Sequence, residues 1–362
     1  MHPSRSAKTS LLAVLAALAL LATAPPAPAA GAARGARPRC VASAGLDGSF
    51  LQLTRADALR PRADWERLFA DMAAVGVKQL FVQWTWADGV AFYAAEAAGP
   101  DDVAVLDLLF ELAEAHGMRV WLGLAHDAGW WAGIDRSRPV ADVEVFLARR
   151  RLANVVVASA LAPQAARRTS FAGWYVPDEI DDKNWLGAQR SALIADYLTE
   201  LGTALVPLVP GAQIAVSGFA QGWSTPEQVV ALWSAILARA PVGLLLFQDG
   251  IGAGKLTLDE LTIYLPLLRR VTDVAGKQLG VVVELFAQGP SGPGTAPAFA
   301  AVPATLARIE RQLALAQRWA SGPRVGFSVP NYMSDFTGAP AASLYADYRR
   351  WIERCARPSG AR

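Results

Sequence analysis

Cysteine and histidine are scarce in this sequence. Only two of the 362 residues are cysteines, Cys40 and Cys355, and only three are histidines, His2, His116 and His126. Zinc sites need a close cluster of these side chains, and their spacing here provides none. No metal site is therefore expected.

The two cysteines lie at opposite ends of the chain. In an exported protein, Cys40 and Cys355 can form one disulfide that ties the N-terminal segment to the last helix. Such a bond requires a fold whose ends meet, as the ends of a closed barrel do. Two unpaired thiols are the alternative interpretation.

An excess of charge of either sign is also missing. The chain has 34 Lys and Arg residues against 32 Asp and Glu residues, a formal net charge of +2. Residues 1–29 contain two of the basic residues and no acidic one, so their removal leaves a net charge of 0. A neutral chain has no general electrostatic attraction for nucleic acid or an anionic membrane. We therefore expect an uncharged polymer or small molecule as the partner.

The hydrophobic run near the N-terminus is too short for a comfortable membrane span. It covers residues 11–22, follows the basic Arg5 and Lys8, and precedes the small residues Ala27, Pro28 and Ala29. This order is typical of a cleaved signal peptide, and an uncleaved anchor is the alternative. No cysteine stands at the cleavage site, so a lipid anchor is not indicated.

The domain organisation follows from this segment. We expect a signal peptide over residues 1–29, a leader segment over 30–44 and a single folded domain over 45–356. After cleavage no membrane span remains, and we expect an exported monomer in the periplasm or the medium.

The remainder of the chain alternates short, nearly continuous apolar runs with amphipathic stretches. Such runs are typical of strands that are buried on both faces. They lie at residues 48–54, 78–84, 119–125, 171–177, 213–219, 243–249, 279–286 and 324–332. The segments between them have helical spacing, for example residues 62–76, where Trp65, Leu68, Phe69 and Met72 share one face.

Eight strand-then-helix units favour a (β/α)8 barrel, the TIM-barrel fold, as a single α/β domain. A doubly wound open sheet is the alternative. That fold usually has a glycine-rich phosphate loop after its first strand, and residues 50–61 contain no glycine.

Active sites of such barrels lie at the carboxyl ends of the strands. The predicted strand ends carry many polar and aromatic residues, which we expect to contact substrate. These residues are Gln52, Gln83, Trp84, Trp86, Asp88, His126, Asp127, Trp130, Trp131, Asp178, Trp223, Gln248, Asp249, Asn331 and Tyr332. Tryptophan faces stack on sugar rings while polar groups bind the hydroxyls, so a carbohydrate site is indicated.

Two carboxylates stand out at these strand ends. Glu179 follows the fourth predicted strand, and Glu284 ends the apolar run of the seventh. An ionisable group in such a run costs several kcal/mol unless it is paired or used, on the order of 2–7 kcal/mol for an unpaired polar group. Across one barrel mouth the two side chains can form the carboxylate pair of a retaining glycosidase. Structural roles are the alternatives: a buried ion pair for Glu284 and a helix N-terminal charge for Glu179.

The residues at these positions resemble a known family. The segments GSFLQ, LFVQW, FAGWYVPDEID, SGF, FQDGIGAG and VVVELF are similar to the bacterial domain of unknown function 4434, over about residues 45–335. That family is grouped with the TIM-barrel glycoside hydrolases. The resemblance implies that Glu179 is the acid/base and Glu284 the nucleophile. In the wider group an Asn usually precedes the acid/base residue, whereas this chain has Asp178.

The resulting hypothesis is an exported glycoside hydrolase that acts on a polysaccharide with retention, with Asp178 or Asp181 as alternative acids. This mechanism requires no cofactor. Two other readings remain open: a non-catalytic glycan-binding barrel in exopolysaccharide or envelope assembly, and a polysaccharide lyase or transglycosidase. The loop GIGAGK (250–255) lacks the spacing of a nucleotide-binding loop, and Lys255 is not followed by Ser or Thr.

Overall fold

The structure is a computed structural model, and it describes residues 45–93, 105–289 and 300–356. Eight parallel strands close into a barrel in the order β1-β12-β9-β8-β7-β6-β5-β2. The barrel strands are β1 (Gly48–Leu51), β2 (Gln79–Val82), β5 (Arg119–Gly123), β6 (Phe171–Asp181), β7 (Gln213–Phe219), β8 (Leu244–Gln248), β9 (Gln278–Glu284) and β12 (Arg324–Phe327). One strand lies within or across each predicted run, and the predicted (β/α)8 barrel is confirmed.

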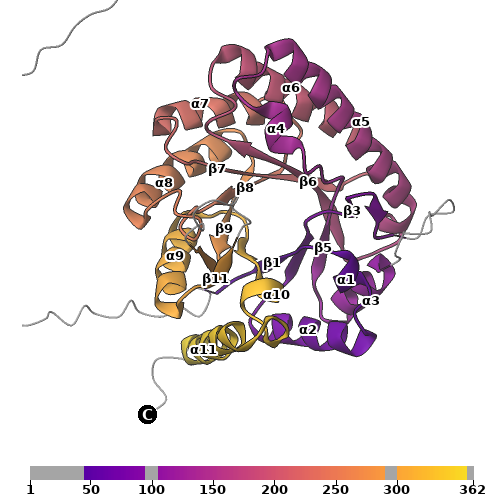
Figure 1. The fold of residues 1–362 in the computed structure, drawn as a ribbon, viewed down its shortest axis with the longest axis vertical. Helices are drawn as coiled ribbons and strands as arrows, with labels where there is room; N and C mark the ends of the chain where they lie inside the picture. The colour runs from indigo at the N-terminus through magenta and orange to yellow at the C-terminus, as the bar shows by residue number, and fades with distance from the viewer. Residues whose placement is uncertain (1–44, 94–104, 290–299, 357–362) are drawn as a thin grey trace, which may run out of the picture. The chain divides into compact units, whose positions relative to one another are not determined.

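Helices surround these strands (Figure 1). The long ones are α2 (Arg62–Ala74), α3 (Leu106–Ala115), α5 (Val140–Ala165), α6 (Ala188–Leu205), α7 (Pro226–Leu237), α8 (Leu258–Val274), α9 (Leu306–Trp319) and α11 (Ala339–Ala356). Their starts follow local rules. In α7, Thr225 and Gln228 form a reciprocal capping box, and Pro226 stands where a missing N–H costs nothing.

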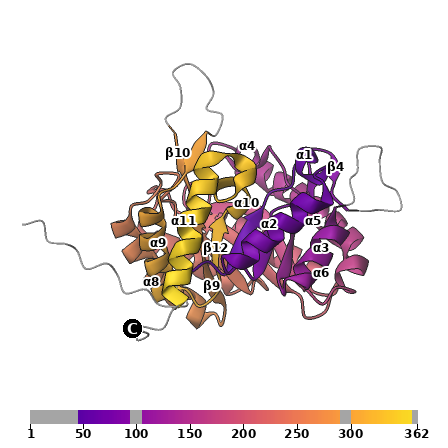
Figure 2. The ribbon, with the colours of Figure 1, turned by 90° about the horizontal axis from the view of Figure 1, so that it is seen from below.

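The shorter elements gather on one side of the barrel. They are α1 (Arg55–Ala58), α4 (Trp130–Ile134), α10 (Val329–Tyr332), the 3-10 helix η1 (Asp335–Thr337), and the hairpins of β3 (Trp86–Ala87) with β4 (Val90–Ala91) and β10 (Phe286–Gln288) with β11 (Ala301–Pro303). Figure 2 shows α1, α4, β4 and β10 at the same edge. Each of these short elements follows the carboxyl end of a barrel strand. They therefore lie on the side of the barrel where enzymes with this fold have their active sites.

The last barrel strand is shorter than the sequence predicts. The predicted run covers 324–332, whereas β12 ends at Phe327 and the helix α10 begins at Val329. Pro330 explains the difference, because it has no N–H for a strand ladder and is well suited to the first turn of a helix.

Apolar side chains fill both the barrel and the layer between strands and helices. Inside the barrel, Phe50, Phe81, Trp121 and Tyr175 pack together, and the rings of Phe81 and Trp121 stack with centroids 5.2 Å apart. The outer layer buries the inward faces of the helices, including Trp65 and Trp233. Strands covered on both faces account for the continuous apolar runs, and the filled interior closes the barrel below the rim.

Within the described residues, no helix combines the length and the apolar character that a membrane crossing requires. At the C-terminal end, Cys355 in α11 is buried and disulfide-bonded. Its predicted partner Cys40, the predicted signal peptide and most of the leader segment lie outside the described residues.

Candidate active site

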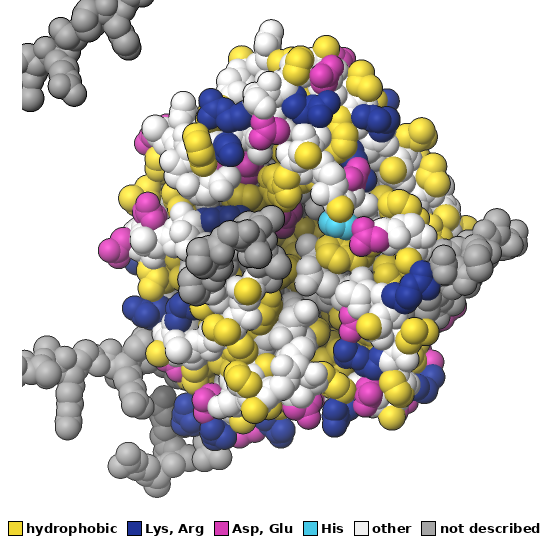
Figure 3. Space-filling model, in the orientation of Figure 1, with side chains coloured by type: hydrophobic (Ala, Val, Ile, Leu, Met, Phe, Trp, Pro, Cys, Tyr) yellow, Lys and Arg dark blue, Asp and Glu magenta, His cyan; other side chains and the backbone are white. Residues whose placement is uncertain are grey.

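A cavity of about 700 Å³ opens at the carboxyl end of the barrel. Figure 3 shows this face hollowed near its centre, with hydrophobic, acidic, basic and histidine side chains around the depression. The predicted site residues that line the cavity are Gln52, Gln83, Trp84, His126, Asp127, Trp130, Trp131, Asp178, Glu179, Gln248, Glu284 and Tyr332. The barrel therefore brings together residues from seven of its eight strand ends, and both predicted catalytic carboxylates are among them.

Glu179 projects into the cavity from an irregular stretch of β6. Val176 pairs with Val216 of β7 and Ile180 with Gly218, so three residues of β6 face the single residue Ser217. After this bulge the pairing with β7 resumes at Ile180 and Asp181. The strand therefore extends to Asp181, beyond the predicted end at residue 177. A bulge redirects the side chains that it contains, and here it lies next to the cavity.

Hydrogen bonds hold both the side chain and the backbone of Glu179. Gln248 Nε2 donates a hydrogen bond to Glu179 Oε1 at 2.6 Å, and the indole of Trp130 donates to the Glu179 carbonyl at 3.0 Å. Burial raises the pKa of Glu179; Lys255 and Gln248 oppose the shift, and the Asp181 charge adds to it. A carboxyl group with a raised pKa is suited to protonate a leaving group near neutral pH.

Glu284 is the last residue of β9 and is 4% exposed. The backbone N–H of Ala253 donates to Glu284 Oε2 at 2.7 Å. Burial raises the pKa of Glu284, while the amides of Ala253 and Gly252 and the charge of Lys255 counteract it by stabilising the carboxylate. The carboxylate is thus oriented by the loop that follows β8.

That loop is the GIGAGK segment, and the anion that its amides bind is the side chain of Glu284. Its amides point at the Glu284 carboxylate, as the amides of anion-binding turns do. Gly252 is essential for this approach, since a Cβ there would lie 2.2 Å from the Phe286 carbonyl oxygen and 3.0 Å from Glu284 Oε2. The glycines that resemble a phosphate loop therefore serve the candidate nucleophile.

Asp249 lies behind Glu284 rather than in the cavity. It is fully buried, and its oxygens accept hydrogen bonds from the Glu284 backbone N–H (3.4 Å), the Ile251 N–H (3.2 Å) and Gln312 Nε2 (2.5 Å). Burial and the Glu284 charge raise the pKa of Asp249 to about 8. The raised pKa of Asp249 favours its neutral form beside Glu284 and leaves the negative charge of the pair to Glu284.

Lys255 supplies the positive charge of the cavity. Its ammonium group lies over the ring of Phe219, 3.2 Å from the centroid. Burial lowers the pKa of Lys255, and the charges of Glu179 and Glu284 oppose that shift. Both candidate catalytic residues are thus coupled electrostatically to one cation, a role that the GIGAGK pattern alone does not indicate.

Asp178, the neighbour of Glu179, faces a buried polar network. Arg150 Nη2 donates to its Oδ1 at 2.7 Å and Asn154 Nδ2 to its Oδ2 at 2.9 Å, and the Tyr197 hydroxyl also donates to Oδ2. Asp178 thereby joins β6 to α5 and α6. The carboxylate that replaces the usual Asn is engaged by an ion pair within the protein.

The other candidate acid, Asp181, is also engaged. Its oxygens accept from the Asn184 backbone (3.0 Å), the Asn184 side chain (2.9 Å) and the Gln221 amide (3.2 Å), and it does not line the cavity. The negative charge of Asp181 adds to the rise in the Glu179 pKa, but burial is the larger cause.

The cavity wall is rich in aromatic rings. Trp84 and His126 pack with ring centroids 4.5 Å apart, and burial lowers the pKa of His126, which favours the neutral imidazole. Trp131 is 42% exposed and presents its indole at the cavity edge. These faces are the kind of surface on which sugar rings stack.

Five predicted substrate contacts do not line this cavity. Trp86 and Asp88 line a neighbouring pocket, and Asp249 supports Glu284 from behind. Trp223 is exposed beside Arg136 and Lys183, and the Asn331 side chain accepts a hydrogen bond from Ser328. Sequence position alone did not separate these residues from the true lining, because strand-end residues point in several directions.

The fold and the cavity define a protein with the architecture of TIM-barrel glycoside hydrolases. A putative alpha-L-fucosidase from Bacteroides thetaiotaomicron VPI-5482 has the same fold with a TM-score of 0.64 and 19% identity, over 85% of this chain and 96% of that one. The hyperthermostable endo-1,4-beta-D-mannanase of Thermotoga petrophila RKU-1 gives a TM-score of 0.55 and 13% identity, over 84% and 99% of the two chains. At these identities the likeness concerns the fold.

Residues 46–342 match the family described as a domain of unknown function (DUF4434), and the chain belongs to that family. The family membership expected from the sequence is confirmed. An uncharacterized protein of Escherichia coli (strain K12), YbcH, is 27% identical over 249 residues, which are 68% of this chain and 79% of YbcH.

Proposed function

We propose that this protein hydrolyses glycosidic bonds of an oligosaccharide or polysaccharide with retention of anomeric configuration. One observation carries the proposal: Glu179 and Glu284, both with raised pKa values, line one aromatic cavity of about 700 Å³ at the carboxyl end of the barrel. The glycoside hydrolases that share the fold support a carbohydrate as the substrate.

The surroundings of the two carboxyl groups fit different roles. Glu284 is stabilised as an anion by the Ala253 amide and Lys255, as a nucleophile must be when it attacks the anomeric carbon. Burial favours the protonated form of Glu179, which then donates its proton to the leaving oxygen. The resulting glycosyl ester on Glu284 is cleaved by a water molecule that gives its proton to Glu179.

The test begins with purified protein that starts after residue 29 and a panel of polysaccharides and aryl glycosides. We expect Glu284→Gln to abolish cleavage of every substrate that the unmodified protein accepts. Glu179→Gln should slow natural glycan cleavage by about 10²- to 10⁴-fold, the usual contribution of general acid–base catalysis. Dinitrophenyl glycosides need no acid, so their glycosylation step should be much less affected by Glu179→Gln.

The matched control is Glu144→Gln, which changes an exposed glutamate on α5. It should cleave like the unmodified protein. Full activity of Glu284→Gln would refute the nucleophile, and an inverted first product in NMR would refute retention. Tight glycan binding without any cleavage would instead favour the glycan-binding barrel.

We also propose that the protein acts after export, on the basis of the N-terminal segment of the sequence. Expression in a Gram-negative host should yield a mature chain that begins just after Ala29 and fractionates with the periplasm or the medium. N-terminal sequencing checks this, and an intact leader on a membrane-bound chain would contradict it.

A further inference from the structure

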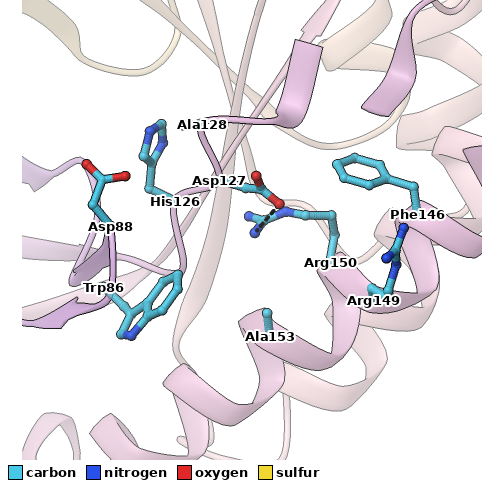
Figure 4. A pocket seen from close by; sticks show the side chains of 9 residues that line it. All are labelled: Trp86, Asp88, His126, Asp127, Ala128, Phe146, Arg149, Arg150 and Ala153. Atoms are coloured by element: carbon cyan, nitrogen blue, oxygen red, sulfur yellow. Dashed lines mark ion pairs between the residues drawn. The ribbon is translucent and has the colours of Figure 1, made fainter. Parts of the chain in front are cut away.

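A second pocket of about 480 Å³ lies beside the candidate active site. His126, Asp127 and Ala128 line both pockets, so one short segment after β5 separates them. Figure 4 shows this pocket between the β3–β4 hairpin, which carries Trp86 and Asp88, and the helix α5, which carries four further lining residues. Its walls come from elements outside the barrel strands, and the candidate catalytic residues Glu179 and Glu284 do not line it.

We propose that this second pocket is a subsite for an uncharged sugar unit of the same glycan chain that is cleaved in the catalytic cavity. The inference rests on the proposed function and narrows its substrate to chains long enough to occupy both pockets. Short glycosides would fill the catalytic cavity alone.

The pocket contains apolar faces suited to a sugar ring. The Trp86 indole is half-buried in one wall, and Phe146 of α5 lies in the opposite wall. Trp86 is held in place because its strand pairs with β4 and its carbonyl accepts the His126 N–H at 2.8 Å. Because the Trp86 side chain is only partly covered and lines the pocket, part of its indole is available for contact with a sugar ring.

The pocket contains charged groups of both signs. Arg150 Nη1 lies 3.6 Å from Asp127 Oδ2, while the same guanidinium makes its shorter ion pair with Asp178. Asp88 on the hairpin and Arg149 on α5 line the pocket at opposite ends, and neither makes an ion pair or hydrogen bond with a residue that the structure describes. A carboxylate and a guanidinium placed in this way can bind the hydroxyls of a neutral sugar from two sides, whereas an acidic sugar would lie against Asp88 and Asp127.

The hairpin keeps Asp88 in its position. Asp88 has φ of 51° in the turn before Gly89, a conformation that Asp and Asn tolerate better than most residues. Asp88→Asn therefore preserves the turn and removes only the charge. This makes it a suitable variant for the pocket.

The experiment measures binding by calorimetry to protein that carries Glu284→Gln, so that no substrate is consumed. The probes are size-graded ladders of neutral manno-, xylo-, gluco- and fuco-oligosaccharides and, for comparison, oligouronides. Within one neutral ladder, we expect the affinity to increase first as the oligosaccharide fills the catalytic cavity. It should increase a second time when the oligosaccharide is long enough to enter the second pocket. Trp86→Ala should reduce that last gain by about tenfold, the equivalent of one aromatic contact, and Trp86→Phe should restore part of it.

Cleavage by otherwise unmodified protein provides the second measurement. Trp86→Ala and Asp88→Asn should lower the ratio of kcat/KM for long chains to kcat/KM for short chains, mainly through KM. Arg149→Ala should also lower this ratio. Its control is Arg167→Ala, which removes an exposed arginine just beyond the C-terminal end of α5.

The outcomes separate this proposal from the proposed function. Length-dependent binding that Trp86→Ala weakens supports the subsite even if no glycan is cleaved. Cleavage with an unchanged long-to-short ratio in Trp86→Ala overturns the subsite and leaves the hydrolase intact. Stronger binding of oligouronides than of every neutral ladder, or binding of no ladder, also overturns it.

Discussion

Two adjacent carboxylates of β6 have different environments. The Asp178 side chain accepts hydrogen bonds from Arg150, Asn154 and Tyr197, whereas Glu179 extends into the cavity and meets Gln248. The β-bulge that contains both residues explains how neighbours in sequence reach different surroundings. The proposed acid thus stands beside a carboxylate whose charge is already paired.

Lys255 should set the pH range of the reaction. Its positive charge lowers the pKa of both Glu179 and Glu284, so its removal raises both values. We expect Lys255→Met to move both limbs of the kcat/KM pH profile to higher pH, and Lys255→Arg to leave them near their original positions. A profile that keeps its limbs in Lys255→Met would contradict this role.

Asp249 should make stability depend on pH. Its folded pKa of about 8 lies above the unfolded value of about 4, so the folded state holds a proton that the unfolded state releases between those values. Unfolding free energy then falls with rising pH across this window, by up to about 1.4 kcal/mol per pH unit from this group.

The variant Asp249→Asn isolates this effect, because Asn does not titrate. The new amide can also donate a hydrogen bond to Gln312 Oε1, which has no hydrogen-bond partner among the residues that the structure describes. We expect the melting temperature of the unmodified protein to fall more steeply from pH 5 to pH 8 than that of Asp249→Asn. Parallel curves would show that Asp249 is not the protonated partner of Glu284.

At the scale of elements, a buried ion pair joins β6 to α5, and a hydrogen bond from the Tyr197 hydroxyl to the same Asp178 joins α6. Arg150 and Asp178 are each 3% exposed. Burial alone would lower the pKa of Arg150, but Asp178, Tyr197 and Asp127 together outweigh it and raise that pKa. Breaking such a pair leaves a buried charge without its partner, which costs far more than the loss of a surface pair.

We expect Asp178→Ala to lower the unfolding free energy by about 3–5 kcal/mol, as measured by the urea midpoint. Asp178→Asn should lose less, because an amide keeps the shape and one acceptor. Asp142→Ala removes an exposed carboxylate on α5 that pairs with Arg138. It should change the unfolding free energy by less than about 1 kcal/mol. Equal effects of Asp178→Ala and Asp142→Ala would rule out a structural role for the buried network.

For the whole molecule, a disulfide between the ends would brace the barrel closure. Cys355 is disulfide-bonded on α11, and the sequence predicts Cys40 as its partner. Closing a loop of this length stabilises a protein by restricting the unfolded chain, typically by about 2–5 kcal/mol. We expect Cys355→Ser, or reduction, to lower the melting temperature, with thiol labelling of the oxidised protein as the check that the bond exists. Rapid labelling of both thiols in native, unreduced protein would contradict the pair.

Much of this protein follows from its sequence. Runs such as 213–219 are mostly apolar because their strands are covered on both faces, and the sequences of the helices between them show caps and inward faces directly. The count of eight units therefore predicts the barrel, and the barrel rule places Glu179 and Glu284 at one rim. Those are consequences of local periodicity and of a topology that the local pattern determines.

Only the tertiary structure decided what each strand-end residue does. The bulge in β6 separates Asp178 from Glu179, the GIGAGK loop turns its amides to Glu284, and Asp249 passes behind the cavity. Trp86 and Asp88 line a pocket of their own for the same reason. Each outcome depends on side-chain direction and on contacts between segments far apart in the chain, and neither is encoded in the hydrophobic period that reveals the strands.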